Sequence, residues 1–243
     1  MSEDSAQGGL QSLDAALSLL ARLGRAPGPQ ALTDLARAEG IPASKAHRYL
    51  ASFVHAGLVR QAGRSGKYDL GPGAMELGLA ALARLDFVNR TADRLPDLVA
   101  ETGLTALLCV WSEAGPVVVR WERSARYMVT ALGLGSTLPL LNSATGRVFL
   151  AYTPEPLTEA LLVRERGGGA VGLREATRAA GYASVTGDLI PGLAAIAAPV
   201  LDWQGQAQAS VTLIGTDPAL VMPEAGAIEK LIRFCRDLSA PER

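Results

Sequence analysis

Residues 32–70 constrain the fold of this chain more than any other stretch, because two short helical patterns and a hairpin pattern follow one another. Thr33 is expected to cap the first helix, since its hydroxyl can accept from an unpaired amide of the first turn, and Gly40 suits the left-handed residue that ends it. Pro42 suits the first position of a second helix at about 42–56, where a missing N–H costs nothing. The pattern predicts a helix-turn-helix.

The second helix separates apolar from polar side chains. At about 100° per residue, one face collects its apolar residues, which are Ala46, Tyr49, Leu50, Phe53 and Val54. The opposite face and its flanks carry hydrogen-bonding side chains, which are Ser44, Lys45, His47, Arg48, Ser52 and His55. A recognition helix needs this division, because one face packs on the domain while the N-terminal residues of the other reach base edges in the major groove.

A basic hairpin follows this helix. Residues 58–60 begin a strand, residues 63–66 form a turn, and residues 67–70 form the return strand. The turn is short and glycine-flanked and carries Arg64, so it can lie against phosphate. The helix-turn-helix is therefore predicted to have a β wing.

A supporting helix is predicted at about 10–24. Leu10, Leu13, Leu17 and Leu20 recur at helical spacing and are expected to form one buried face. Residues 10–70 would then be a winged domain of three helices. Residues 10–72 hold eight Lys or Arg and four Asp or Glu, a net charge of +4, whereas the rest of the chain carries −5. A basic module on an acidic body is the division expected of a DNA-binding protein.

These observations assign DNA contacts to named side chains. We expect base or near-base contacts from Ser44, Lys45, His47 and Arg48, and phosphate contacts mostly from Thr33, Ser52, Arg60, Arg64 and Lys67. Two alternatives stay open at this point. The polar face can be a merely solvated face, and a winged helix can also bind a protein partner.

Residues 71–90 are predicted to be a linker. Gly71 to Gly73 break the chain after the wing, and a helix at about 73–90 is apolar over much of its circumference. Such a helix needs burial on more than one side, so packing between subunits and packing in an ordinary core are both open. A second helix is predicted at about 91–102.

Residues 91–240 read as an α+β domain. The predicted strands are about 105–111, 117–121, 128–132, 182–186, 193–200 and 207–214, and the predicted helices are about 143–152, 155–165, 172–180 and 223–238. Hairpins at both ends of this pattern indicate an antiparallel sheet covered by helices.

Enzymatic chemistry has little support in the sequence. The only histidines are His47 and His55, so no Ser-His-Asp or Cys-His arrangement can form within the C-terminal half. Cys109 has no basic neighbour in sequence to activate it, and no His/Cys spacing suggests a metal. Gly167, Gly169 and Gly172 match a G-x-G-x-x-G pattern but follow a charged run instead of a strand. We expect no catalytic residue, metal or cofactor, although carboxylate or metal-dependent chemistry stays open.

The sequence also predicts a compartment. Cys109 and Cys235 lie far apart in apolar surroundings, as buried free thiols of a reducing compartment do. The first nine residues, MSEDSAQGG, are acidic and polar and do not read as a signal peptide. No apolar run is long enough to span a bilayer, so we expect a cytoplasmic protein without a membrane partner.

An anion site is predicted near residues 142–146. If a helix starts at Ser143, the amides of Ala144, Thr145 and Gly146 point out of its first turn and favour an organic carboxylate. The alternative is that Asn142 or Ser143 only caps the helix.

The chain resembles the IclR-type bacterial transcriptional regulators. The matching segments are QSLDAALSLLARL at 11–23, LTDLARAEGIP at 32–42, AHRYL at 46–50, KYDLGP at 67–72, LPLLNSATGRVFLAY at 138–152 and residues 190–215. The family commonly has Lys-Ser-Thr before Ala-His-Arg, where this chain has Ala43-Ser44-Lys45, which affects the expected operator sequence.

The resemblance implies a GAF-like effector domain that binds a small organic acid. Carried over by position, the effector site comprises Tyr127, Thr130, Leu138, Asn142, Ser143, Ala144, Thr145, Leu193, Ala195, Ser210 and Thr212. Some relatives have Cys or Ser in place of Ala195 and Ile214, so a less polar pocket and an aromatic or branched acid are expected. Candidate partners for its carboxylate are Arg120, Arg123, Arg126 and Arg147. The predicted protein is a ligand-responsive regulator that binds double-stranded operator DNA as a homodimer or homotetramer.

Overall fold

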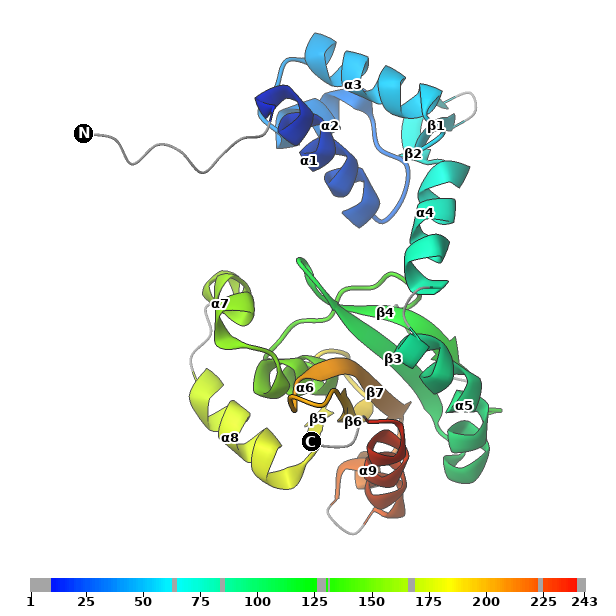
Figure 1. Ribbon diagram of the computed structural model, residues 1–243, viewed down its shortest axis with the longest axis vertical. Helices are drawn as coiled ribbons and strands as arrows, with labels where there is room; N and C mark the ends of the chain where they lie inside the picture. The colour runs from blue at the N-terminus through cyan, green and yellow to red at the C-terminus, as the bar shows by residue number, and fades with distance from the viewer. Residues whose placement is uncertain are drawn as a thin grey trace, which may run out of the picture. The chain divides into compact units, whose positions relative to one another are not determined.

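The computed structural model describes residues 10–62, 65–83, 86–125, 130, 132–165, 169–222 and 225–239. The chain divides into two compact units, residues 1–84 and residues 85–243 (Figure 1). Each unit has its own sheet and its own helices. In the described part of the chain, no helix is both long and apolar enough to cross a membrane.

The N-terminal unit is a winged helix-turn-helix. Its helices are α1 (Gln11–Arg25), α2 (Leu32–Ala38), α3 (Ala43–His55) and α4 (Pro72–Ala83), and its hairpin is formed by β1 (Val59–Ala62) and β2 (Lys67–Leu70). β1 and β2 pair antiparallel, and Gln30 adds a bridge of two 2.8 Å backbone hydrogen bonds to Tyr68. The predicted order of three helices and a wing is confirmed.

The face of α1 that packs on this unit is not the predicted one. Its buried residues are Ala16, Leu19 and Leu23, whereas Leu13 and Leu17 are half exposed and Leu10 precedes the helix with 72% of its surface exposed. Leu20 is partly buried against the core. α1 carries more leucine than one face can hold, so two stripes of leucine both fit the helical spacing. Only packing against α2 and α3 decides which stripe is buried.

Three local predictions in this unit are also wrong. α2 begins at Leu32 after Ala31, without a side-chain cap, so Thr33 lies within the first turn. Pro42 precedes α3 as its N-cap residue. Val54, predicted to be inward-facing, is 41% exposed, whereas Ala46, Leu50 and Phe53 are buried. α3 therefore has a narrower core face than its apolar residues suggest.

The helix boundary in the linker lies earlier than predicted. α4 ends at Ala83 and α5 runs from Asp86 to Thr102, so residues 86–90 belong to α5. The described side chains of α4 have no apolar partner that buries them, and Met75, Leu77 and Leu79 are each more than half exposed. α4 is thus an apolar helix in solvent within this chain.

The C-terminal unit contains one five-stranded sheet in the order β4-β3-β7-β6-β5, with every neighbouring pair antiparallel. The strands are β3 (Thr105–Ser112), β4 (Gly115–Glu122), β5 (Ala183–Thr186), β6 (Ala194–Leu201) and β7 (Ala207–Gly215). The predicted strand at 128–132 lies largely outside the described residues, and Thr130 and Leu132 are not in a strand.

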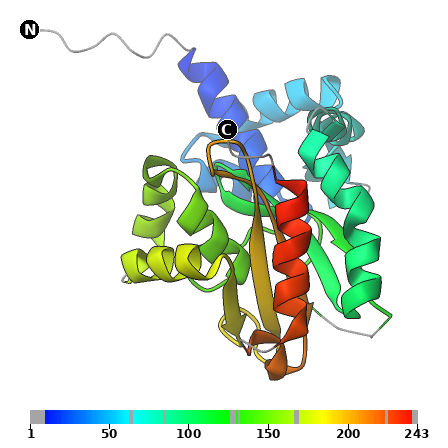
Figure 2. The ribbon, with the colours of Figure 1, turned by 60° about the horizontal axis from the view of Figure 1, so that its bottom comes forward.

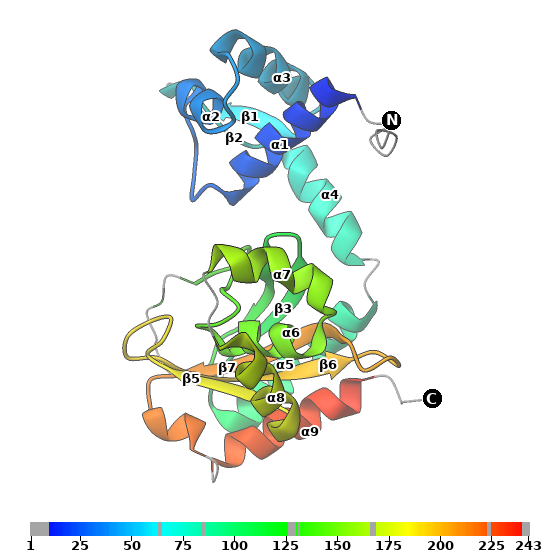
Figure 3. The ribbon, with the colours of Figure 1, turned by 90° about the vertical axis from the view of Figure 1, so that its left-hand side faces the viewer.

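Helices cover both faces of this sheet (Figures 2 and 3). α5 and α9 (Gly226–Leu238) lie side by side on one face, in contact with β3, β6 and β7. α6 (Ala144–Tyr152) packs on the other face, and α8 (Ala170–Ala180) packs on α6. The remaining helices are α7 (Glu155–Arg164) and the 3-10 helix η2 (Pro218–Val221). The predicted antiparallel sheet with helical cover is confirmed.

Candidate functional site

The polar face of α3 projects from the N-terminal unit into solvent. Ser44, His47, Arg48 and Ser52 are exposed, and Lys45 is partly exposed. The other side of the helix is anchored by Ala46 and Leu50, both with 0% exposure. Because the helix is fixed through these buried residues, its polar side chains are presented on a rigid support, as groove recognition requires.

Two contacts orient side chains on this face. The Lys45 ammonium lies 5.7 Å from the centroid of the Tyr49 ring, a cation–π geometry. The Ser52 hydroxyl donates a 3.2 Å hydrogen bond to the Arg48 carbonyl oxygen. The Tyr49 hydroxyl is buried and has no partner among the described residues. Lys45 and Ser52 are thus held close to α3 rather than extended from it.

The residues predicted to contact phosphate lie in three different settings. Thr33 is exposed in the first turn of α2, and Lys67 is exposed on β2. Arg60 on β1 forms a 3.0 Å ion pair with Asp69, so a phosphate must compete with that carboxylate. Arg64 lies outside the described residues. The wing therefore offers Lys67 as an exposed cation and Arg60 as a paired one.

A cavity of about 40 Å³ lies between α6 and the sheet in the C-terminal unit. Its described lining is mostly apolar and comprises Leu107, Leu132, Leu138, Ser143, Ala144, Thr145, Val185, Leu189, Ile190, Leu193, Ala195, Thr212 and Ile214. Such a volume holds one or a few water molecules, whereas ligand pockets are on the order of 300–1,000 Å³. The cavity is therefore too small for such a ligand in this conformation.

The cavity brings together seven of the residues predicted for the effector site: Leu138, Ser143, Ala144, Thr145, Leu193, Ala195 and Thr212. Three others, Thr130, Asn142 and Ser210, do not line it. Asn142 is exposed, the Thr130 hydroxyl accepts from the Leu132 amide, Ser210 is buried elsewhere, and Tyr127 lies outside the described residues. Of the candidate arginines, Arg120 donates to its neighbour's carbonyl oxygen, Arg123 is exposed, and Arg126 is not described.

Five lining residues were not predicted: Leu107, Leu132, Val185, Leu189 and Ile190. A sixth, Ile214, was named in the sequence analysis only as a position where some relatives have Cys or Ser. Strand periodicity places both Ile214 and Leu107 near Thr212. Ile214 lies two residues after Thr212 and thus on the same face of β7, and Leu107 is the cross-strand partner of Thr212. The segment at 187–193 has no periodic signal that places it over α6.

A hydroxyl pair forms the polar part of the cavity wall. Thr145 on α6 and Thr212 on β7 share a 2.6 Å hydrogen bond, and both side chains are buried. The Cys109 thiol is near Thr145. Burial raises the pKa of this thiol to about 12, and the hydrogen bond with Thr145 lowers it by a smaller amount. The Ser210 hydroxyl next to Cys109 is buried and has no partner among the described residues.

The start of α6 differs from the predicted one. Ser143 is the N-cap residue, and its hydroxyl accepts from the Gly146 amide at 2.9 Å and donates to the Pro139 carbonyl oxygen at 2.6 Å. The Gly146 amide is therefore not available to an anion. Ser143 can cap the helix while the amides of Ala144 and Thr145 bind a ligand, because the cap uses the amide of Gly146.

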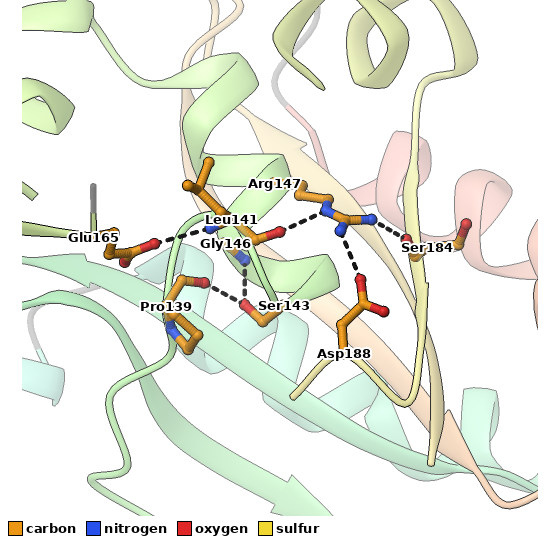
Figure 4. A network of polar contacts seen from close by, with 8 residues as sticks. All are labelled: Pro139, Leu141, Ser143, Gly146, Arg147, Glu165, Ser184 and Asp188. Carbon is orange, nitrogen blue, oxygen red and sulfur yellow. Dashed lines mark hydrogen bonds and ion pairs between the residues drawn. The ribbon is translucent and has the colours of Figure 1, made fainter. Parts of the chain in front are cut away.

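Polar contacts fasten the loop before α6 on two sides (Figure 4). The Glu165 carboxylate accepts from the amides of Leu140 at 2.8 Å and Leu141 at 3.1 Å. On the other side, the Arg147 guanidinium contacts the Leu141 carbonyl oxygen, the Ser184 carbonyl oxygen and the Asp188 carboxylate. The loop thus lies between a carboxylate and a guanidinium.

A larger hollow of about 510 Å³ lies elsewhere in this unit, between β6 and the C-terminal part of α9. Its lining includes Tyr152, Pro199, Cys235 and Arg236. None of the described residues that were predicted for the effector site lies in it. Among the residues that the structure describes, no cluster of His, Cys, Asp or Glu could hold a metal ion.

Comparisons with known proteins give a consistent result for this architecture. The family model of the IclR helix-turn-helix domain matches residues 12–63. The crystal structure of Pseudomonas aeruginosa HmgR shares 34% identity, covers 95% of this chain and 97% of that chain, and has a TM-score of 0.58. The chain belongs to the IclR family of transcriptional regulators.

Among other members of the IclR family, the share of the chain that is matched differs. The transcriptional repressor IclR of Escherichia coli is 30% identical over 162 residues, which are 66% of this chain and 59% of that protein. An IclR homologue from Microbacterium hydrocarbonoxydans, crystallised with 4-hydroxybenzoate, is 20% identical with a TM-score of 0.73 and covers 94% of this chain and 98% of that chain. At that identity the likeness shows the fold alone.

Proposed function

We propose that this IclR-family protein binds operator DNA through α3 and the wing and responds to a small organic acid held under α6. The observation that carries the DNA-binding half is the exposed polar face of α3 on a buried apolar anchor. Ser44, Lys45, His47 and Arg48 would contact bases in the major groove. Thr33, Ser52, Arg60, Arg64 and Lys67 would mostly contact phosphate.

The exposed apolar residues of the N-terminal unit support an oligomer. Leu13 and Leu17 on α1 and Met75, Leu77 and Leu79 on α4 are half exposed or more. Apolar residues gathered on helices in this way are typical of subunit interfaces. A homodimer or homotetramer would place two recognition helices on two half-sites, which multiplies specificity.

The cavity under α6 is the proposed effector site. Its hydroxyl pair, Thr145 and Thr212, offers hydrogen-bonding groups in an otherwise apolar lining, which suits an aromatic or branched acid. The 4-hydroxybenzoate held by the Microbacterium homologue is an acid of this kind. Effector binding would change operator affinity only if the effector prefers one arrangement of the DNA-binding units, with α4 as the connecting element.

Fluorescence anisotropy on the intergenic DNA upstream of the protein's own gene, against a shuffled duplex, tests the DNA-binding half. We expect a preference of about 10³ or more for the native duplex, and a steep loss of affinity as salt rises. Weak and equal binding to both duplexes, with and without 4-hydroxybenzoate, would favour a protein partner for the winged helix instead.

Arg48→Ala tests the recognition helix itself. If Arg48 reads a base, the substitution weakens binding to the native duplex by about 1–3 kcal/mol. Arg164→Ala is the matched control, because it removes the same charge from an exposed position on α7. Equal affinities of the two variants would remove Arg48 from the DNA interface.

A further inference from the structure

Arg147 is held in place by three hydrogen-bonded contacts, and only one of them is to a charged group. Its Nε donates to the Leu141 carbonyl oxygen at 2.7 Å, and its Nη1 donates to the Ser184 carbonyl oxygen at 2.7 Å. Its Nη2 lies 2.8 Å from the Asp188 carboxylate. The two neutral carbonyl groups fix the plane of the guanidinium, so Nη2 is directed to one position, which a carboxylate now occupies (Figure 4).

Each of these partners lies close in sequence to residues that line the cavity, although it does not line the cavity itself. Leu141 lies in the loop between Leu138 and Ser143, Ser184 precedes Val185, and Asp188 precedes Leu189. The flanking residues named here line the cavity. The three contacts of Arg147 therefore join the loop before α6, strand β5 and segment 187–193, all of which contribute residues to the cavity of about 40 Å³ or flank such residues.

Asp188 is the more exposed partner of this ion pair. The Asp188 side chain is 40% exposed, whereas the Arg147 side chain is 19% exposed and starts from a buried helix. Asp188 lies in a turn flanked by Gly187 at φ 74° and Gly192 at φ 81°, conformations that glycine adopts without strain. If the pair opens, Asp188 returns to water at little cost, while Arg147 remains fixed and needs a new anion.

We propose that Asp188 acts as an internal counter-ion that occupies the effector's place on Arg147. Building on the proposed effector site, an aromatic acid enters by offering its carboxylate to Nη2 of Arg147. Asp188 leaves, and segment 187–193 is released from the cavity. The exchange replaces one carboxylate by another, so the charge of Arg147 is compensated before and after. Arg147 then selects acids, and Asp188 sets how readily the cavity opens.

Calorimetric titration of the full chain with 4-hydroxybenzoate, and with the uncharged isostere 4-hydroxybenzamide, tests the exchange. Asp188→Asn keeps Arg147 but weakens its internal partner, so the acid should bind about five- to tenfold more tightly, the difference between a charge-assisted and a neutral hydrogen bond. Arg147→Gln should abolish the preference for the acid over the amide. Glu101→Gln is the matched control, since it removes a 2.8 Å surface ion pair to Arg233 on the opposite helical layer.

Amide hydrogen exchange without ligand tests the closing contact separately. Deuterium uptake at residues 187–193 should rise in Asp188→Asn and stay at the wild-type level in Glu101→Gln. Unchanged exchange in Asp188→Asn would overturn the proposal. Equal affinity for acid and amide, or no binding of 4-hydroxybenzoate to either wild type or Asp188→Asn, would overturn it too. None of these measurements uses DNA, so a failed operator assay and a failed counter-ion exchange are distinguishable.

Discussion

The two units of this chain place their polar and apolar side chains in opposite ways. In the N-terminal unit, the hydrogen-bonding face of α3 lies in solvent, and so do apolar residues such as Leu17 and Met75. In the C-terminal unit, the hydroxyl groups of Thr145 and Thr212 are buried and bonded to each other within an apolar lining. One unit offers a surface, and the other encloses a small volume.

The difference fits what each unit is proposed to bind. Exposed side chains on a fixed helix suit a large, rigid, charged ligand such as DNA. Exposed apolar residues suit an interface with a second subunit. A small molecule must be surrounded, so its site consists of side chains that are satisfied internally when it is absent. Substitutions of the exposed residues of the N-terminal unit should therefore act mainly on binding, whereas substitutions at the cavity of the C-terminal unit should act on both folding and binding.

A pair of leucines in α1 tests the surface assignment most strongly. Leu19 has 0% exposure, so Leu19→Ala should lower the free energy of unfolding by about 2–5 kcal/mol in urea titration. Leu17 is 50% exposed, so Leu17→Ala should change it by no more than about 0.5 kcal/mol at low protein concentration. Sedimentation should show weaker self-association for Leu17→Ala. Equal destabilisation by the two variants would contradict the assignment of the α1 faces.

A glycine in α6 tests how tightly the C-terminal unit encloses its cavity. A Cβ at Gly146 would lie 1.9 Å from the Pro139 carbonyl oxygen and 2.6 Å from the Leu140 Cα, both backbone atoms. Gly146→Ala should therefore displace the loop and cost about 1–3 kcal/mol or more. Gly172→Ala on α8 is the control, because nothing lies within 4 Å of its Cβ, and it should be neutral or slightly stabilising. Thermal unfolding measures both.

An ion pair in the N-terminal unit predicts a dependence of stability on pH. Burial alone would raise the pKa of Glu39, but hydrogen bonds from Arg22 and Ser18 and the charges of Arg22 and Arg25 outweigh it, so this pKa lies below its usual 4.5. A depressed pKa stabilises the folded state above the unfolded value, and that contribution is lost as the pH falls through the folded value.

Glu39→Gln should therefore lower the free energy of unfolding at pH 7 by on the order of 1 kcal/mol, reduced because Arg22 is half exposed. In urea titrations across pH, the variant and the wild type should differ above pH 4.5 and converge as the pH falls through the lowered pKa of Glu39 in the folded state. A constant difference between pH 3 and pH 7 would show that Glu39 contributes by packing alone.

The smallest effect is expected from the thiols, both of which lie in the C-terminal unit. Cys109 and Cys235 are buried, and burial raises the pKa of each thiol, that of Cys109 to about 12. Because the thiolate is the reactive form, neither should react with a disulfide reagent at pH 8 in the folded protein, and both should react in urea. Rapid labelling of the folded chain would show that this unit opens more readily than its packing suggests.

Much of the architecture could be predicted from local signals. The order of the helices and strands, the wing and the antiparallel sheet follow from period-3.6 and period-2 patterns and from turn residues such as Gly40. The errors arose where two local solutions were equally good. Leu13 and Leu19 of α1 both belong to leucine stripes, and Thr33 is a good capping residue that the chain does not use as one.

By itself, the sequence determined the type of most elements and the polar face of α3, because these depend on residues close together in the chain. Only the tertiary structure decided which leucines of α1 are covered and which side chains meet at the cavity. It also decided that Arg147 is paired with Asp188. Those contacts join residues far apart in sequence, so their geometry depends on how the sheet and helices pack, which no local pattern contains.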